Sequence, residues 1–460
     1  IIINMSISRP FDILIYGATG VAGKHVVKHF LNNHPMIKMA IGGRNKSKLE
    51  QLMNELNNSD NSNNKINPKQ ILVASSDNEN DLHHILSQTK VVLACAGPYR
   101  QCGKYIVEAA IKAQTDYLDL CGEPQFFDDM FVEYDSMAKE RNVLVVSACA
   151  FDCVPSEMCF QLASKELLKK YSGTSAAVTN VEIVHTFSGI KKANDTTFHA
   201  AVDGFHAAYT GELKSSRQKV KEAFPLLQSS MIKDGNTRSS EWKRFISKPG
   251  TSPLYHEDTN THILKFMGAD ASCILASDRY LRLRCCENGD AVEEQKQQEQ
   301  QPPPFPFLSV AFGIAEKSHA YKFLTYGAIF STLAKWSWGC KLLHSNPDFF
   351  TNGFFTSGGP TEDDMKDAKF ATYGTAYGLT KDQCVKVKFS GGEPGYIATS
   401  AMMSALALTV LNHKDALKFK GGVCTPGSAF SDCDIVFDML KQEGLDIEVI
   451  STDGNDLAVE

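Results

Sequence analysis

Three glycines, spaced three residues apart, form the pattern in this chain that most directly predicts chemistry. Gly17, Gly20 and Gly23 follow an apolar strand-like stretch, residues 13–16, and open a stretch with helical spacing, residues 21–31. The first glycine permits a tight turn, the second lets the backbone approach a pyrophosphate, and the third lets the helix pack close to the sheet. The spacing is G-x-x-G-x-x-G rather than G-x-G-x-x-G, and a plain turn is the alternative. The predicted dinucleotide-binding loop comprises Gly17, Ala18, Thr19, Gly20, Val21, Ala22 and Gly23.

The end of the second predicted strand, residues 39–41, indicates which dinucleotide binds. An enzyme that uses NAD usually places Asp or Glu there, to bond the ribose 2′-hydroxyl. This chain instead has Arg44, Lys46 and Ser47, which offer two positive charges and a hydroxyl. These groups suit the 2′-phosphate of NADP. The sequence therefore predicts NADP rather than NAD, with a solvated basic turn as the alternative.

A further turn follows the fourth predicted strand, residues 91–94. Ligands of doubly wound sheets bind outside the carboxyl ends of the strands. Ala96, Gly97 and Pro98 are small or rigid residues at such an end, and we expect them to line the cofactor. Tyr99 follows and is a candidate proton donor facing the nicotinamide. Packing of its ring against the loop is the alternative.

Carboxylates follow the fifth and sixth strands, residues 117–120 and 143–146. Asp119 and Glu123 are candidate acids of the site, with helix capping as the alternative for both, and Asp152 is a candidate for orienting substrate. The predicted catalytic set is Tyr99, Glu123 and Asp152. No metal site is predicted, because the nearby cysteines lack the ligand spacing of common zinc sites.

Alternating strands and helices must position these residues. Six short apolar strands separated by helical stretches predict a parallel sheet with right-handed crossovers. The predicted strands are residues 13–16, 39–41, 71–74, 91–94, 117–120 and 143–146. The fold class is therefore α/β, with an N-terminal Rossmann-type doubly wound parallel sheet.

Two later regions differ in composition from the rest of the chain. Residues 287–304 include a low-complexity run, EEQKQQEQQPPP, and we interpret them as an insertion. The apolar segment 305–340 has charge-free runs shorter than the ~18–20 residues that a membrane-spanning helix needs. It suits either a buried core or an interfacial contact with a membrane or lipid droplet. Residues 394–413 are also charge-free but rich in small residues, which favours a helix packed inside the protein.

Composition excludes several classes of protein. The 460 residues carry 47 Lys and Arg against 53 Asp and Glu, and this balance gives no basic excess for nucleic-acid binding. The 13 cysteines are an odd number in a long chain without a C-x-x-C pair. They indicate reduced thiols on the cytoplasmic side rather than a disulfide scaffold of a secreted protein.

The chain resembles the saccharopine dehydrogenase-like oxidoreductases. The resemblance rests on FDILIYGATGVAGKHV, VVLACAGPYRQCGKYIVEAA, DYLDLCGEP, SACAFDCVPSE, FMGADASCILASDRYL, PDFFTNGFFTSGGPT, GGEPGYIATSAMMSALALTVLN and GGVCTPGSAF. It implies an NAD(P)-binding domain, residues 9–157, and an α+β substrate domain with its own sheet, residues 158–460. It also implies a late helix, for which 397–411 is the candidate, that packs near the first domain. The block that follows Phe187 departs from the pattern of the relatives.

Similar sequences include trans-acting enoyl reductases, and family members associate with membranes and lipid droplets. The resemblance therefore implies an NADP-dependent reductase of a hydrophobic acyl or enoyl lipid, in lipid or glycolipid metabolism. The first alternative is a non-catalytic, NADP-binding lipid-droplet protein. The second is an extended short-chain dehydrogenase, whose Y-x-x-x-K spacing occurs here only at Tyr377 to Lys381, far from the glycine loop. We expect no nucleic-acid partner and leave open a homodimer.

Overall fold

The computed structural model describes residues 9–58, 65–171, 177–225, 245–250, 252–288 and 305–451. The chain forms two compact units. Unit 1 contains the N-terminal residues up to Ala150 together with Thr399–Cys424 and Ala429–Glu443, whereas unit 2 contains the remaining residues.

Unit 1 is built on a seven-stranded parallel sheet whose strands are largely apolar along their whole length. Such strands are typical of parallel sheets that are covered on both faces. In sheet order the strands are β15 (Gly422–Cys424), β6 (Leu144–Val146), β5 (Asp116–Asp119), β4 (Thr89–Ala94), β1 (Phe11–Tyr16), β2 (Met39–Gly43) and β3 (Ile71–Val73). The six strands predicted from the sequence are confirmed, with ends shifted by one or two residues.

Helices of unit 1 connect these strands and cover the sheet. They are α1 (Val21–Asn33), α2 (Lys46–Asn58), α3 (Glu79–Leu86), α4 (Tyr99–Ala113), α5 (Pro124–Glu140), α15 (Thr399–His413) and α17 (Ile435–Gln442). The order β3-β2-β1-β4-β5-β6 confirms the predicted doubly wound α/β class.

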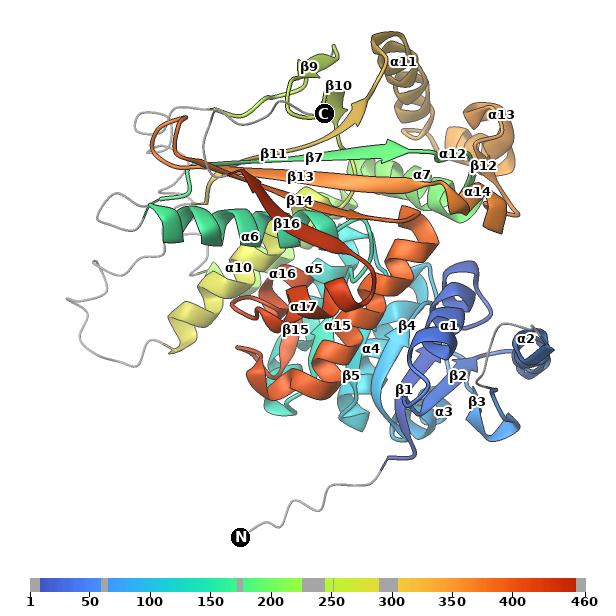
Figure 1. Ribbon diagram of the computed structural model, residues 1–460. Coiled ribbons are helices and arrows are strands. Elements are labelled where there is room, and N and C mark those ends of the chain that lie inside the picture. The colour runs from blue at the N-terminus through green and yellow to red at the C-terminus, as the bar shows by residue number, and fades with distance from the viewer. Residues whose placement is uncertain are drawn as a thin grey trace. The chain divides into compact units, whose positions relative to one another are not determined.

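The C-terminal part of the chain returns to unit 1, and this corrects the predicted division into residues 9–157 and 158–460. Strand β15 pairs with β6 in parallel, and α15 packs against α1, β4 and β5 (Figure 1). Residues Thr399–Val410 of α15 are all buried. A helix that is apolar on every side needs cover all round, so α15 completes this core although it lies far along the chain.

The same region contains one helix that is long and apolar enough to span a membrane by length and composition, Pro394–Ala416. Within its most apolar window, 83% of the residues are buried inside the structure. This burial agrees with the prediction of a helix packed inside the protein.

Unit 2 contains a second seven-stranded sheet, of mixed direction. Its order is β16 (Asp446–Ser451), β14 (Cys384–Gly391), β13 (Lys369–Tyr377), β7 (Asn180–Ser188), β11 (Phe307–Ile314), β10 (Thr261–Lys265) and β9 (Leu254–His256). Only β7 and β11 pair in parallel among these described strands. Helix α6 (Val154–Lys170) lies across β7, β13 and β14 (Figure 1). This unit confirms the predicted α+β second domain.

The other elements of unit 2 surround this sheet. They are β8 (Ala193–Asn194), β12 (Phe355–Thr356), α7 (Asp195–Thr210), α8 (Glu212–Ala223), α10 (Asp270–Asn288), α11 (Lys317–Leu333), α12 (Ser337–Ser345), α13 (Pro347–Thr351), α14 (Glu362–Lys366), η2 (Pro394–Ala398) and α16 (Pro426–Ala429). Of the predicted insertion 287–304, residues 287 and 288 end α10, and 289–304 lie outside the described residues.

Candidate functional site

The glycine loop of unit 1 has a shape that only glycine allows at two of its positions. Gly17 adopts φ +84°, in the left-handed region that disfavours side chains, and a Cβ at Gly23 would lie 2.3 Å from the Gly17 carbonyl oxygen. The Gly17 amide donates to the Gly42 carbonyl at 2.9 Å. The loop is therefore anchored to the end of β2, and α1 begins immediately beside the sheet.

The amino end of α1 has the free N–H groups that a phosphate needs. Gly20 is the N-cap, with no side-chain hydrogen bond, and no acidic residue lies in the first turn. The first-turn amides of a helix lack partners within the helix, and Gly20 and Val21 are exposed here. The backbone donors, the positive helix end and the missing side chains fit the pyrophosphate of a dinucleotide.

The turn after β2 presents cations next to this loop. Arg44 is exposed and makes no ion pair with any residue that the structure describes, whereas Lys46 lies 3.8 Å from Glu50. The Arg44 charge acts on the side chains of Tyr16 and Cys102, which places it near the end of β1 and the first turn of α4. A free guanidinium at this point fits a 2′-phosphate.

Ser47 lies inside the second helix and does not cap it. Helix α2 begins at Lys46, and the Asn45 side chain accepts the Lys48 amide at 3.0 Å. The asparagine satisfies a first-turn amide and takes over the capping role. Ser47 is therefore exposed in the first turn, where its hydroxyl remains available to a ligand.

The turn after β4 packs directly against the glycine loop. The Cys95 amide donates to the Tyr16 carbonyl at 2.8 Å, and a Cβ on Gly17 would lie 2.7 Å from the Ala96 nitrogen. Gly97 and Pro98 are exposed. The structure thus brings Ala96, Gly97 and Pro98 to the same edge of the sheet as the glycine loop, and their contact with the cofactor stays a prediction.

The hydroxyl of Tyr99 is committed to the backbone. It donates to the Ala94 carbonyl at 2.8 Å and accepts the Leu120 amide at 3.2 Å. The side chain is buried, and this burial raises the pKa of Tyr99 well above its usual value. These contacts tie the end of β4 to the end of β5 and fit the packing role that the sequence left open better than proton donation.

Glu123 and Asp119 also bond to neighbouring turns. Glu123 accepts the Tyr99 amide at 3.0 Å and pairs with Arg100 at 2.7 Å. Asp119 is fully buried and accepts the amides of Cys121 and Ala148 at 2.9 and 2.8 Å. Burial raises the pKa of Asp119 to about 6. Both carboxylates hold strand ends in place, which suits positioning residues rather than groups that transfer protons to substrate.

Asp152, the third predicted catalytic residue, lies in unit 2 on the turn before α6. Its side chain reaches solvent, and no hydrogen bond or ion pair joins it to another described residue. The surrounding protein desolvates the carboxylate, and the negative charge of Asp270 acts in the same direction. Together they raise the pKa of Asp152 to about 6, against a smaller opposing effect of His185. An accessible acid with a pKa near neutrality is suited to general acid catalysis.

Asp270 and His185 belong to a buried polar cluster that the sequence did not reveal. His185 Nε2 lies 3.2 Å from both Asp270 Oδ1 and Ser156 Oγ, and His185 Nδ1 lies 2.8 Å from Thr372 Oγ1. Ser156 also donates to Asp270. All four side chains are fully buried. The hydrogen bonds fix the orientation of the imidazole next to the carboxylate.

One atom of this cluster lacks a partner. Asp270 Oδ2 is buried without a hydrogen bond to any described residue. A Cβ at Gly268 would lie 3.2 Å from this oxygen and would clash with the Phe266 ring. A buried carboxylate oxygen is costly when unsatisfied. The Phe266 ring occupies the space that a side chain at position 268 would need, so only glycine fits there.

The four members of this cluster come from β7, β13, α6 and α10, and 85 residues separate His185 from Asp270. Each one alone is an ordinary polar residue in an apolar stretch. The available signal concerned two of the four, because Ser156 and Asp270 lie in blocks that carry the family resemblance, SACAFDCVPSE and FMGADASCILASDRYL.

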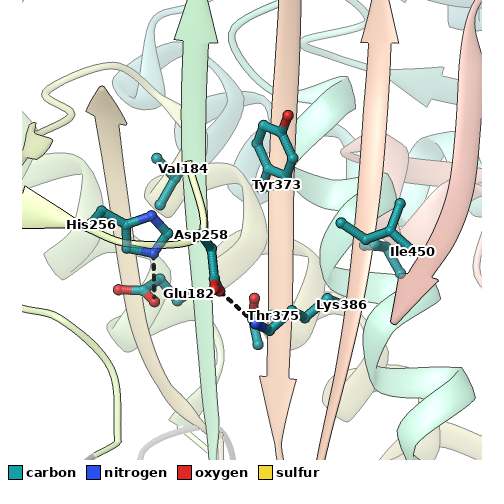
Figure 2. A pocket seen from close by; sticks show the side chains of 9 residues that line it. Glu182, Val184, His256, Asp258, Tyr373, Thr375, Lys386 and Ile450 are labelled. Atoms are coloured by element: carbon teal, nitrogen blue, oxygen red, sulfur yellow. Dashed lines mark hydrogen bonds and ion pairs between the residues drawn. The ribbon is translucent and has the colours of Figure 1, made fainter. Parts of the chain in front are cut away.

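A separate pocket on the second sheet does not serve as a substrate site. Figure 2 shows that Glu182 faces His256 and that Asp258 faces Lys386. These pairs lie 3.4 and 2.8 Å apart, respectively. The cavity measures about 10 Å³, which is no more than one water molecule requires. The Lys386 charge is balanced there by Asp258.

Comparison with known proteins agrees with this architecture. Residues 13–146 match the family "Saccharopine dehydrogenase NADP binding domain". The chain is 28% identical to a saccharopine dehydrogenase-like oxidoreductase of Rattus norvegicus, over 96% of this chain and 98% of that protein. It is 27% identical, over the same shares of the two chains, to a "Lipid droplet localized protein" of Caenorhabditis elegans.

Two further similarities concern part of the chain or the fold alone. A "Trans-acting enoyl reductase" of Mycobacterium bovis is 32% identical over 33% of this chain and 34% of that protein. The solved saccharopine dehydrogenase (L-Glu forming) of Saccharomyces cerevisiae shares 10% identity and a TM-score of 0.51, over 96% of this chain and 100% of that one. The glycine loop, the match of residues 13–146 to the NADP-binding domain and the near-full-length relatives together show that the chain is similar to the saccharopine dehydrogenase-like oxidoreductases.

Proposed function

We propose that the chain is an NADPH-dependent reductase of a hydrophobic acyl or enoyl substrate. The observation that carries the proposal is a row of aromatic rings in unit 2, which begins at the buried polar cluster. His185 contacts Phe266 at 4.9 Å between ring centroids, Phe266 contacts Phe312 at 6.2 Å, and Phe312 contacts Phe323 at 4.9 Å. Phe323 lies on α11 and is exposed. The row therefore leads from the buried polar cluster to the surface through apolar contacts.

Additional rings line the other side of the cluster. Phe151 and Phe187 lie 5.7 and 6.4 Å from the His185 ring, and Phe370 lies 4.8 Å from Phe151. Aromatic surfaces gain free energy by covering apolar groups of a ligand. An acyl chain is the substrate class that this lining favours over a charged amino acid.

The proposed reduction adds a hydride and a proton to a carbon–carbon double bond. The glycine loop would hold NADPH, which would provide the hydride for the β-carbon of an activated double bond. The Asp152 carboxyl group delivers the proton to the α-carbon and becomes a carboxylate. Asp270 and His185 set the charge around Asp152, so we assign them as positioning residues. The aromatic lining excludes water from the reacting carbon atoms.

The direct test is NADPH oxidation by purified protein with trans-2-enoyl thioesters of increasing chain length. Each buried methylene contributes about 0.8 kcal/mol, so we expect kcat/KM to rise about fourfold per methylene until the aromatic row is covered. NADPH binding without oxidation on enoyl or 3-ketoacyl substrates of any length would contradict the proposal. That result would favour the non-catalytic, NADP-binding alternative.

A second proposal concerns attachment to a lipid surface. Apolar side chains are exposed along α11–α13, and Trp338 and Phe349 show 61% and 81% of their surface. This aromatic face comprises Tyr321, Phe323, Tyr326, Ile329, Trp336, Trp338, Leu342 and Phe349. The buried-core interpretation of 305–340 thus fits β11 better than α11. Trp and Tyr rings prefer the boundary between water and lipid. The lipid-droplet name of the nematode relative supports the same location.

Vesicle flotation tests the aromatic face. We expect the wild-type chain to float with vesicles of phosphatidylcholine and phosphatidylserine, because the exposed Lys322, Lys335 and Lys341 add attraction to anionic lipid. Trp338→Glu combined with Phe349→Glu should reduce the bound fraction at least about tenfold. The double variant lacks two rings that would enter the lipid, and it gains two negative charges that would have to leave water, so the free energy of binding becomes less favourable. Tyr255→Glu, on β9 with 52% of its surface exposed, is the matched control. Equal flotation of all three proteins would contradict lipid attachment through α11–α13.

A further inference from the structure

Three metal-ligating side chains meet at the carboxyl end of α1, at the other end of the helix from the glycine loop. His29 Nε2 lies 2.5 Å from one carboxylate oxygen of Glu443, and His34 Nε2 lies 2.8 Å from the other. One ligand atom from each residue lies within 4.8 Å of the other two. All three belong to unit 1. The sequence predicted no metal site here, because 409 residues separate His34 from Glu443.

The end of α1 brings the two imidazoles to one side. Residues five apart on a continuous helix differ by about 140° in direction, so His29 and His34 would diverge if the helix continued. The helix instead ends at Asn33, and His34 adopts φ −128° and ψ 62° while its amide still donates to Phe30. The two imidazole centroids then lie 6.0 Å apart. Both Nε2 atoms thus point at the same carboxylate.

The electrostatic surroundings favour a cation between these groups. Only 3% of the Glu443 side chain is exposed, and the residue caps the carboxyl end of α17. His34 caps the carboxyl end of α1. Each helix end carries roughly half a negative charge, and the Glu443 carboxylate adds a full one. A buried carboxylate needs a compensating positive charge, and a cation bound between the three side chains would supply it.

We propose that His29, His34 and Glu443 form a binding site for a divalent transition metal of the Zn²⁺ class. Two imidazole nitrogens and one carboxylate oxygen are ligands that Zn²⁺ prefers, whereas Ca²⁺ and Mg²⁺ prefer oxygen alone. The side chains are partly shielded, with 14% of His29 and 19% of His34 exposed. An ion can therefore enter from solvent. The Ser404 hydroxyl, 3.1 Å from His34 Nε2, is a further polar group of the site.

The site joins segments from opposite ends of the chain. His29 and His34 belong to the helix that begins at the nucleotide loop, and Glu443 ends the last helix of the segment that returns to unit 1. A link between residues 414 positions apart closes a very long loop, and closing long loops gains the most from a metal clip. We assign the ion a structural role, in which it fastens α17 to the nucleotide-binding sheet.

Metal titration of chelator-treated protein tests this site. We expect one equivalent of Zn²⁺ to bind per chain by isothermal titration calorimetry, and Co²⁺ in its place to give visible absorption bands of low coordination number. The double variant His34→Ala/Glu443→Gln should lose more than about 100-fold in Zn²⁺ affinity, because altered outer-shell groups alone cost 10- to 100-fold. His83→Ala/His84→Ala is the matched control, since both histidines are exposed on α3 of the same unit.

Folding of the variants is checked independently by circular dichroism and by the thermal shift with NADPH, whose proposed loop lies at the opposite end of α1. Unchanged Zn²⁺ affinity in a folded His34→Ala/Glu443→Gln variant would overturn the site. So would an absence of binding by the wild-type chain, because the three groups would then form an ion pair only. If the double variant does not fold, Zn²⁺ affinity is measured on the conservative single variant Glu443→Asp instead.

Discussion

NADPH should raise the melting temperature of the wild-type chain and leave that of a Gly20→Val variant unchanged. A ligand that binds only the folded state stabilises it by about 2.7 kcal/mol at 100 times its dissociation constant. A Cβ at Gly20 would lie 3.3 Å from the Gly17 carbonyl oxygen, a tight contact that needs a small shift, and Gly20 has an extended backbone that valine also adopts, so the variant should fold. Its side chain would nevertheless stand where the pyrophosphate must approach the backbone. Thermal shift and fluorescence titration both measure this loss.

The same experiment, carried out with NADPH and with NADH, tests whether Arg44 distinguishes the two nucleotides. We expect Arg44→Ala to weaken NADPH binding by about tenfold or more, since a charge-assisted bond to phosphate contributes about 1.5–3 kcal/mol. NADH binding should change little. Lys48→Ala, a nearby exposed cation outside the predicted set, is the matched control. An equal effect of Arg44→Ala on both nucleotides would refute the assignment of Arg44 to the 2′-phosphate.

Asp152→Asn should lower the rate of enoyl reduction by about 10²- to 10⁴-fold, the usual contribution of a general acid. NADPH affinity should stay the same, because Asp152 is not among the residues assigned to the cofactor. The proton donor must be protonated, so activity of the wild-type chain should fall as pH rises through the Asp152 pKa of about 6. Asp363→Asn, an exposed acid of α14, provides the control.

The variant Asp270→Asn distinguishes positioning from catalysis. The Asp270 charge raises the pKa of Asp152, so its removal should move the midpoint of the pH–rate profile to lower pH. A merely structural effect would lower the rate at every pH without moving this midpoint. Equal turnover by Asp152→Asn and wild type would show that another group or a water molecule delivers the proton.

The local part of the nucleotide site was predictable from the sequence because it is built from consecutive residues. A buried parallel strand needs a continuous apolar run, and a strand that turns at once into a helix needs glycine at Gly17 and Gly23. Arg44 follows the next strand, so its place at the same sheet edge follows from the parallel topology alone. The prediction of NADP required no further information.

The roles of Tyr99 and Glu123 were harder to predict, because residue type does not reveal which way a side chain points. Both lie at the expected sheet edge, as predicted. The Tyr99 hydroxyl turns back to Ala94 and Leu120, and Glu123 turns to Tyr99 and Arg100. Both side chains satisfy polar groups of neighbouring backbone there, instead of pointing toward a substrate.

The sequence by itself determined the α/β class, the glycine loop and the cofactor, since these depend on periodicity and on contacts between near neighbours. The family resemblance already implied that a late helix, α15, returns to the first domain, but only the tertiary structure decided that β15 joins the first sheet. It alone joined His185 to Asp270, and His29 and His34 to Glu443. The physical reason is that such contacts depend on the path of the chain between distant elements. The apolar and polar residues at each end are compatible with many paths, and packing of the whole core selects one.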